Sequence, residues 1–125
     1  MNTEINQLTE QIIGAAIEVH RELGPGLLES AYQKALAYEF ALRGLKFEEQ
    51  KLCPIKYKDL LIEDAYRLDF IVSGLVVVEL KTVDALIDVH EAQVLTYLKF
   101  TGCHLGLLLN FNSTTLIKGL RRLAL

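Results

Sequence analysis

Residues 67–81 read RLDFIVSGLVVVELK, in which two apolar runs flank a Ser-Gly pair. This pattern predicts two antiparallel strands joined by a tight turn. Asp69, Glu79 and Lys81 interrupt the apolar runs. Glu79 and Lys81 share one face of their strand, because side chains two apart point the same way. Asp69 and Glu79 can lie on one side of the pair, since Cβ atoms are about 4.5 to 5.5 Å apart for direct cross-strand neighbours and about 7 to 8 Å for diagonal ones.

Two carboxylates placed in this way repel each other, and removing them from water adds a desolvation cost. A cation between them offsets both costs, as does a proton taken up by one of them. Hard divalent cations such as Mg²⁺ accept carboxylate and carbonyl oxygens, and an ammonium such as that of Lys81 can orient water or offset charge on a phosphate. The alternative is an ordinary salt bridge of Asp69 with Arg67 or Lys81 on a solvated face of the sheet.

Two amphipathic helices are expected before this hairpin. From residue 5 to about residue 23, apolar residues recur every three or four positions, which is typical of a helix with one buried face. Gly-Pro-Gly at 24–26 ends that helix, since glycine adopts the left-handed conformation past a helix end and proline cannot continue it. A second helix is expected at about 27–43, with Gly44 as its stop.

The other elements complete an α/β fold. Asp88 and Glu91 have the spacing of a capping box, and Gly102 is placed to end the helix that follows. The expected elements are strands at 46–57, 60–72 and 75–83, a helix at 89–101, a strand at 104–111, and an edge strand or short helix at 114–123. The predicted order is α-α-β-β-β-α-β, with one mixed sheet flanked by helices in a single domain over 1–125.

Further polar residues lie on the apolar faces of the predicted helices. Glu29 falls on the stripe that contains Tyr32, although a carboxylate in a first turn is also stabilised by the helix dipole. His90, Gln93 and Tyr97 form a polar and aromatic ridge on the helix at 89–101.

Composition narrows the class of protein. The net charge of −3 argues against binding of nucleic acid through bulk positive charge. Basic residues nevertheless cluster, and a solvated surface is the alternative explanation for them. The clustered residues are Lys46, Lys51, Lys56 and Lys58 in one segment and Lys118, Arg121 and Arg122 in another.

The remaining signals concern location and cysteine chemistry. No apolar run is long enough to span a membrane, and residues 1–11 lack the pattern of a secretory signal, so a cytoplasmic location is expected. Cys53 and Cys103 belong to no Cys-x-x-Cys pair and are expected to be buried thiols. The edge strand near 115–122 could pair with another copy, which makes a homodimer the expected assembly.

Four motifs in order carry a family resemblance. They are GLLESAY with Gly26, Glu29 and Tyr32, then YRLDFIV, then VVVELK, then HEAQVLTYLK with Gln93 and Tyr97. Together they resemble the GxxExxY family of the PD-(D/E)XK nuclease superfamily, near its RecB-like branch, over nearly the whole chain. The residue before Asp69 is Leu68 where the superfamily motif has proline.

That resemblance implies an α-β-β-β-α-β core and a role for each matching residue. Asp69 and Glu79 would hold Mg²⁺ or Mn²⁺ with the carbonyl of Leu80, and Lys81 would be the catalytic lysine. Glu29 would support the metal site. The other implied residues are Gln93, Tyr97 and Tyr32 for substrate contact, and His20 as a further metal ligand.

The expected function is therefore metal-dependent hydrolysis of phosphodiester bonds in nucleic acid, with DNA favoured over RNA as the substrate. A metal-activated water would attack the phosphate. The alternative is a catalytically silent nuclease fold that binds nucleic acid or protein, since a fold does not by itself establish a function.

Overall fold

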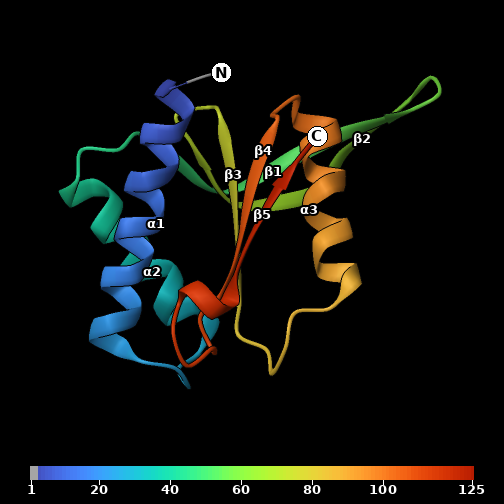
Figure 1. Cartoon of the computed structure of the whole chain (residues 1–125). Helices are drawn as coiled ribbons and strands as arrows, with labels where there is room; N and C mark the ends of the chain where they lie inside the picture. The colour runs from blue at the N-terminus through green and yellow to red at the C-terminus, as the bar shows by residue number, and fades with distance from the viewer. Residues whose placement is uncertain (1–2) are drawn as a thin grey trace.

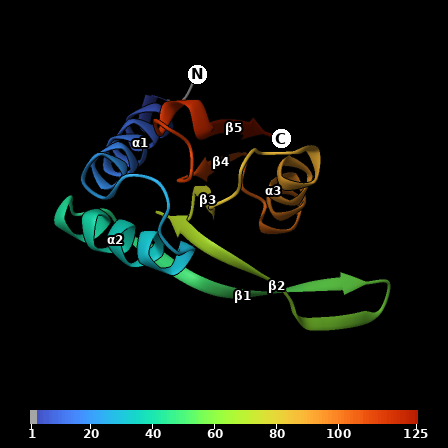
Figure 2. The same ribbon diagram turned by 90° about the horizontal axis from the view of Figure 1, so that it is seen from below.

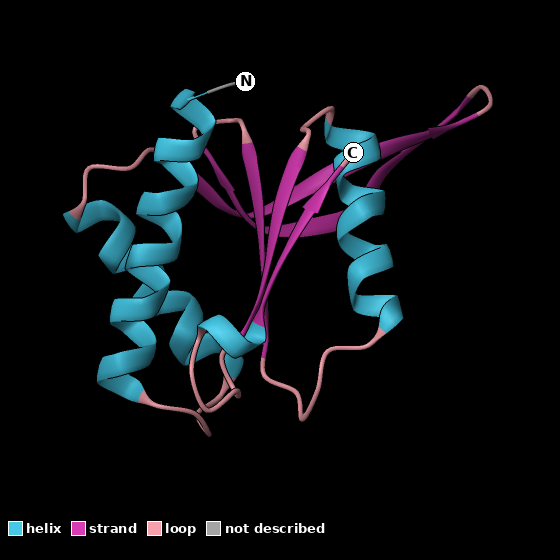
Figure 3. Cartoon of the chain, viewed as in Figure 1, coloured by secondary structure: helices cyan, strands magenta, loops and turns pink. Residues whose placement is uncertain are grey.

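A five-stranded mixed sheet forms the centre of the computed structural model, which describes residues 3–125 (Figure 1 and Figure 3). The strands are β1 (Phe47–Tyr57), β2 (Leu60–Val72), β3 (Val76–Lys81), β4 (Leu105–Asn110) and β5 (Leu120–Ala124), and they lie in this order across the sheet. β3 and β4 are parallel, whereas the other neighbours are antiparallel. The expected α/β class with a mixed sheet flanked by helices is confirmed.

Helices cover both faces of this sheet. α1 (Thr3–Leu23) and α2 (Glu29–Leu42) lie on one face, and α3 (Asp88–Thr101) lies on the other, as Figure 2 shows. Val76, Val78 and Leu80 of β3 pack into the core beneath α1 and α2, whereas Val77 packs into the core beneath α3. Since side chains alternate along a strand, Glu79 belongs to the face covered by α3.

The Gly-Pro-Gly segment joins the first two helices as expected. Gly24 and Gly26 have φ angles of 70° and 99°, a conformation in which a side chain would be strained. α1 buries the side of the helix that carries Ile12, Ala15 and Val19, which agrees with its apolar spacing. The turn therefore lets α2 fold back and present its first residue, Glu29, to the edge of the sheet.

The connection through α3 brings two strand ends together. In a parallel pair the carboxyl ends lie at the same edge, and here Lys81 pairs in register with Asn110. The amide of Asn110 is buried, donates to the carbonyl of Val83 at 2.9 Å, and accepts from the N–H of Val83 at 3.1 Å. These bonds fix the loop after β3 and hence the place where Lys81 leaves the sheet.

Some predicted ends and caps differ from the structure. The stretch at 114–123 forms both expected elements, a 3-10 turn η1 (Ile117–Gly119) followed by β5. The capping box of Asp88 and Glu91 is wrong, since Ile87 is the N-cap of α3. The N–H of Ile87 instead donates to Nδ1 of His90 at 3.0 Å, so a histidine takes the place that glutamate or glutamine usually has in this motif.

β1 and β2 form a hairpin that projects past α3 (Figure 2). β3 pairs with β2 only at residues 70–72, so the outer part of the hairpin is a two-stranded ribbon. This ribbon carries Lys56 and Lys58 of the basic segment. Cys53 at its base and Cys103 after α3 are both buried and unpaired, which confirms their expected state as thiols.

Close packing of α3 on β4 gives the first testable prediction. A Cβ atom at Gly106 would lie 2.6 Å from Cγ1 of Val94, and valine cannot move aside because its side chain has little rotamer freedom. Gly106→Ala should therefore lower the free energy of unfolding by about 1 to 3 kcal/mol in urea denaturation. The double variant with Val94→Ala should be less destabilised than additivity of the single changes predicts.

Gly14→Ala provides the matched control in α1. The nearest atom to its added Cβ is the flexible Nη1 of Arg43 at 3.1 Å, and alanine favours a helix relative to glycine. This variant should be neutral or slightly more stable. A loss of stability in Gly14→Ala as large as that in Gly106→Ala would contradict the packing argument.

Candidate functional site

The ladder between β2 and β3 ends at the two acidic residues. The last pair is Phe70 with Val78, and one step further in the same register Asp69 would face Glu79. At this step side chains replace the backbone partners: the N–H of Asp69 donates to Oε1 of Glu79 at 3.0 Å, and the N–H of Leu80 donates to Oδ2 of Asp69 at 2.9 Å. Each carboxylate is therefore fixed by the backbone of the other strand.

The backbone of β2 twists at this point. Leu68 packs beneath α3 and Phe70 beneath α1 and α2, although residues two apart in a regular strand share a face. Opposite Asp69 on β1, Gln50 has a φ angle of 50°, and its Nε2 donates to Oδ1 of Asp69 at 3.4 Å. The irregularity turns the Asp69 carboxylate toward β3, where it meets Glu79.

Glu79 is 4% exposed, and its environment favours the protonated form. Burial and the adjacent charge of Asp69 raise the pKa of Glu79 from 4.5 to about 9, and the Lys81 ammonium opposes this shift only in part. A proton thus holds the two carboxyl groups together at neutral pH when no cation is bound. The same position suits a divalent cation, which offsets more negative charge than a proton does.

α2 brings a third carboxylate toward this pair. Glu29 is the first residue of the helix, and the pKa of Glu29 is raised by burial of its carboxyl group and by the charge of Asp69, while Lys81 lowers it. Gln33 lies one turn later, and its Nε2 contacts the carbonyl of Asp69 at 3.3 Å and Oε2 of Glu49 at 3.1 Å. Sequence reasoning missed Gln33, although its spacing of four from Glu29 places both on one side of the helix.

α3 contributes from the opposite face of the sheet. Burial and then the charge of Glu79 raise the pKa of the Tyr97 hydroxyl, and a hydrogen bond from Gln93 to that hydroxyl lowers it. The ring of Tyr97 stacks on Tyr66 of β2, with ring centroids 4.9 Å apart and planes 14° apart. The structure thus brings Gln93 and Tyr97 to the carboxylates, and stacking on Tyr66 holds the Tyr97 ring in place.

Tyr32, expected to contact substrate, is a buried core residue. Its ring is 0% exposed and stacks on Phe111, with centroids 4.7 Å apart. The hydroxyl donates to the carbonyl of Gly24 and accepts from the N–H of Leu27 at 3.2 Å. A direct substrate contact does not agree with this burial, and the tyrosine instead holds the turn that precedes Glu29.

His20 is also committed to contacts within the chain. It is buried, its Nε2 lies 2.8 Å from the carbonyl oxygen of Ser113, and its ring lies against Phe111. A carbonyl accepts only from a protonated nitrogen, so Nε2 carries the proton and cannot bind a metal while this bond is made. A ligand role for His20 would require the ring to leave Ser113.

The donor set around Asp69 and Glu79 fits a hard cation. Within residues 3–125, no group of three or more His, Cys, Asp or Glu side chains is arranged as a metal site. Two carboxylates with a backbone carbonyl are nevertheless a common Mg²⁺ ligand set, because Mg²⁺ keeps several waters. Burial and then the charge of Asp69 raise the pKa of Glu79, and a divalent cation at this position would offset both effects.

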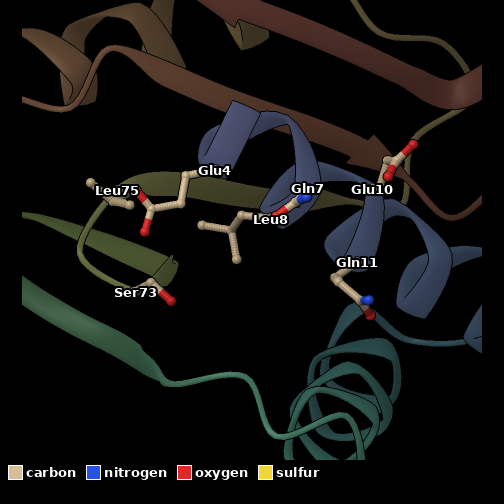
Figure 4. Close-up of a pocket in the computed structure, with 7 residues that line it drawn as sticks. All are labelled: Glu4, Gln7, Leu8, Glu10, Gln11, Ser73 and Leu75. Carbon is tan, nitrogen blue, oxygen red and sulfur yellow. The ribbon is translucent and has the colours of Figure 1, made fainter. Parts of the chain in front are cut away.

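A larger hollow lies away from these residues. It has a volume of about 560 Å³ between the first turns of α1 and the turn after β2, where Figure 4 shows Glu4 and Leu8 beside Ser73 and Leu75. Glu4 and Glu10 are its charged lining residues, so it repels phosphate. This hollow is therefore a poor candidate for a phosphate site, although its volume is larger than that of the groove beside Lys81.

The two basic segments lie at opposite edges of the sheet. Lys51 pairs with Glu48 at 2.9 Å on β1, and Arg121 lies 4.0 Å from Glu91 on the side of β5. Lys118 and Arg121 also line a cavity of about 190 Å³ beside Asn110. The positive charge thus flanks the sheet and does not form one patch over Asp69 and Glu79.

Comparison with family models identifies the superfamily of this fold. The model of the PD-(D/E)XK nuclease superfamily matches residues 6–123. The chain therefore belongs to the PD-(D/E)XK nuclease superfamily. Comparison with curated proteins and with solved structures gave no significant match. In the part of the chain that the structure describes, no helix is both long and apolar enough to cross a membrane.

The proton held by Glu79 predicts how stability depends on pH. In the unfolded chain Glu79 ionises near 4.5, whereas the native state keeps its proton up to about pH 9. The native state therefore binds more protons in this interval, so the stability of the EDTA-treated protein should fall as pH rises. The slope has a ceiling of about 1.4 kcal/mol per pH unit.

Urea denaturation of the EDTA-treated protein between about pH 6 and pH 8 measures this slope. Glu79→Gln should remove most of it, because the amide does not ionise. Glu63→Gln changes an exposed glutamate of the projecting hairpin and should keep the slope of the unmodified protein. An equal slope in Glu79→Gln and the unmodified protein would show that Glu79 is already ionised.

Proposed function

We propose that this protein is a metal-dependent nuclease that hydrolyses phosphodiester bonds of nucleic acid, with DNA as the favoured substrate. The observation that carries the proposal is the contact of half-buried Asp69 with buried Glu79, in which Glu79 holds a proton at neutral pH. A structural salt bridge would join the carboxylates to a cationic side chain, whereas this pair faces a third carboxylate, Glu29. Such an arrangement suits an ion that arrives from solution.

In this proposal Asp69, Glu79 and the carbonyl of Leu80 hold Mg²⁺ or Mn²⁺, with Glu29 as the supporting carboxylate. When bound, the divalent cation supplies an acidified water and positive charge beside the phosphate. Lys81 leaves the sheet next to Leu80, where its ammonium can orient the attacking water and offset charge that develops on the phosphate. Gln93 and Tyr97 hold the Glu79 side of the site in position.

Finer features of the proposal rest on the sequence motifs. Gly26, Glu29 and Tyr32 match the G-x-x-E-x-x-Y pattern, so we place the chain in the GxxExxY family near the RecB-like branch. A homodimer through the edge strand β5 and a cytoplasmic location complete the proposal. Light scattering tests the dimer, since a monomer mass at micromolar concentration would remove it.

Metal binding with proton release is the first test. If a cation displaces the proton of Glu79, Mg²⁺ or Mn²⁺ binding near pH 7 should release about one proton per ion. Isothermal titration in two buffers of different ionisation enthalpy measures this number. Glu79→Gln should bind without releasing that proton, and Asp69→Asn should bind at least tenfold more weakly.

Glu63→Gln serves again as the matched control and should bind and release as the unmodified protein does. Absence of any heat of binding in the unmodified protein at millimolar metal would remove the metal site from the proposal. Binding without proton release would place the ion elsewhere on the surface.

Cleavage is the second test. The purified protein should cut labelled single-stranded or duplex DNA in the presence of Mn²⁺ or Mg²⁺, and EDTA should abolish cutting. Lys81→Met keeps the aliphatic stem but removes the ammonium, and should lower kcat by a hundredfold or more. Lys118→Met changes an exposed lysine of the basic segment and should lower kcat far less.

The second candidate function is a silent module that binds nucleic acid or protein without cutting. The outer part of the β1–β2 hairpin extends beyond β3 and has no third strand beside it. This favours the second candidate function, because an exposed strand edge can bind an extended partner. Binding of oligonucleotides without cleavage, by a protein that also fails to bind metal, would support this function over the nuclease. Cleavage that Lys81→Met leaves unchanged would indicate a contaminating enzyme.

A further inference from the structure

A groove of about 470 Å³ runs along α3 directly beside Lys81. Its lining residues are Lys81, Val89, His90, Ala92, Gln93 and Thr96. The volume is within the range of pockets that hold small ligands. The groove therefore continues the site at the end of β3 along the first turns of α3, on the face of the sheet to which Glu79 belongs.

The hydrogen bond that caps α3 fixes the protonation of His90. Nδ1 accepts from the N–H of Ile87 at 3.0 Å, and a nitrogen that accepts in this way has no proton of its own. The neutral ring must then carry its proton on Nε2, which is a hydrogen-bond donor. Within residues 3–125, the ring makes no hydrogen bond through Nε2, so this donor is available to a ligand.

The charges around the groove favour an anion. Lys81 supplies an ammonium at one end of the groove, and the groove follows the first turns of α3, near the positive end of the helix dipole. Glu91 in this turn lies 4.0 Å from the guanidinium of Arg121, which offsets its charge. Asp88 is exposed and is not among the lining residues.

The remaining lining residues suit the rest of a nucleotide. Val89 and Ala92 present aliphatic surface, and Thr96 adds a hydroxyl further along the helix. An anionic group at Lys81 and His90 with a less polar body along α3 is the chemistry of a phosphate joined to a sugar and a base. Gln93 lies between these two parts and also holds Tyr97.

We propose that this groove is a nucleotide-binding subsite, in which Nε2–H of His90 donates to a phosphate oxygen of the nucleotide adjacent to the cleaved bond. The inference rests on the proposed nuclease function for the identity of that bond. One expected result does not depend on cleavage: the groove should bind a single nucleotide in the absence of metal.

Nuclear magnetic resonance tests the binding step without catalysis. Thymidine 5′-monophosphate added to the EDTA-treated protein should shift the backbone amide signals of residues 89–96 and the ring signals of His90. His90→Gln keeps an acceptor for the N–H of Ile87, as glutamine does in a capping box, but its NH₂ group is on the same terminal carbon and does not reach the position of Nε2. This variant should bind about tenfold more weakly, the loss expected for one hydrogen bond to a charged group.

His104→Gln is the matched control. His104 is an exposed histidine before β4 whose Nδ1 lies 3.3 Å from the carbonyl of Leu125, outside the groove. It should bind the nucleotide as the unmodified protein does. Thermal melting of His90→Gln establishes that α3 is still folded, and His90→Glu, which also keeps the cap acceptor, provides a second variant if it is not.

Kinetics separates this inference from the proposed function. With an oligonucleotide substrate, His90→Gln should raise KM about tenfold and change kcat much less, since the bond is made to a phosphate that does not react. Nucleotide shifts at His90 without any cleavage would support the subsite and overturn the nuclease. Cleavage with an unchanged KM in His90→Gln, and no shift at residues 89–96, would overturn the subsite and leave the nuclease intact.

Discussion

The structure around the site depends on two carboxylates, Asp69 and Glu79, which replace backbone hydrogen-bond partners between β2 and β3. Asp69 accepts from the N–H of Leu80, and Glu79 accepts from the N–H of Asp69, so each strand is held by a side chain of the other. These bonds satisfy the backbone N–H groups of Asp69 and Leu80 where the ladder ends. They also fix two acidic groups side by side, with Glu79 buried and Asp69 half-buried. A proton or a cation between the two carboxyl groups therefore stabilises the site.

The surrounding elements converge on this pair from both faces of the sheet. α2 brings Glu29 and Gln33 from one face, and α3 brings Gln93 and Tyr97 from the other. This is possible because β3 is the central strand and its carboxyl end is open beside that of β4. Buried residues with partners inside the chain, such as Tyr32 at the turn and Asn110 at the end of β4, keep these elements in place.

The sequence indicates the charged residues of the site more clearly than the neighbouring residues that hold them in place. Asp69, Glu79 and Lys81 are conspicuous because charged groups interrupt apolar strands. Gln33 and Gln50 are ordinary polar residues, and their contacts with Asp69 depend on how α2 and β1 pack against β2. Spacing predicts a cap of α3 by Asp88 and Glu91, whereas in the structure the N–H of Ile87 donates to the ring of His90, which reaches back from the first turn.

The sequence by itself determined the class of fold, the order of its elements through β4 and the strand positions of the acidic pair, since apolar periodicity and glycine placement are local properties of the chain. The predicted order α-α-β-β-β-α-β omits β5, because the sequence left the last stretch open between a strand and a short helix. Only the tertiary structure decided that Glu79 is buried beside Asp69, that Tyr32 is a core residue, and that His90 faces a groove with Lys81. These features depend on distances between segments far apart in the chain. A strand twist at Asp69 and the packing of three helices set those distances, and neither leaves a periodic signal in the sequence.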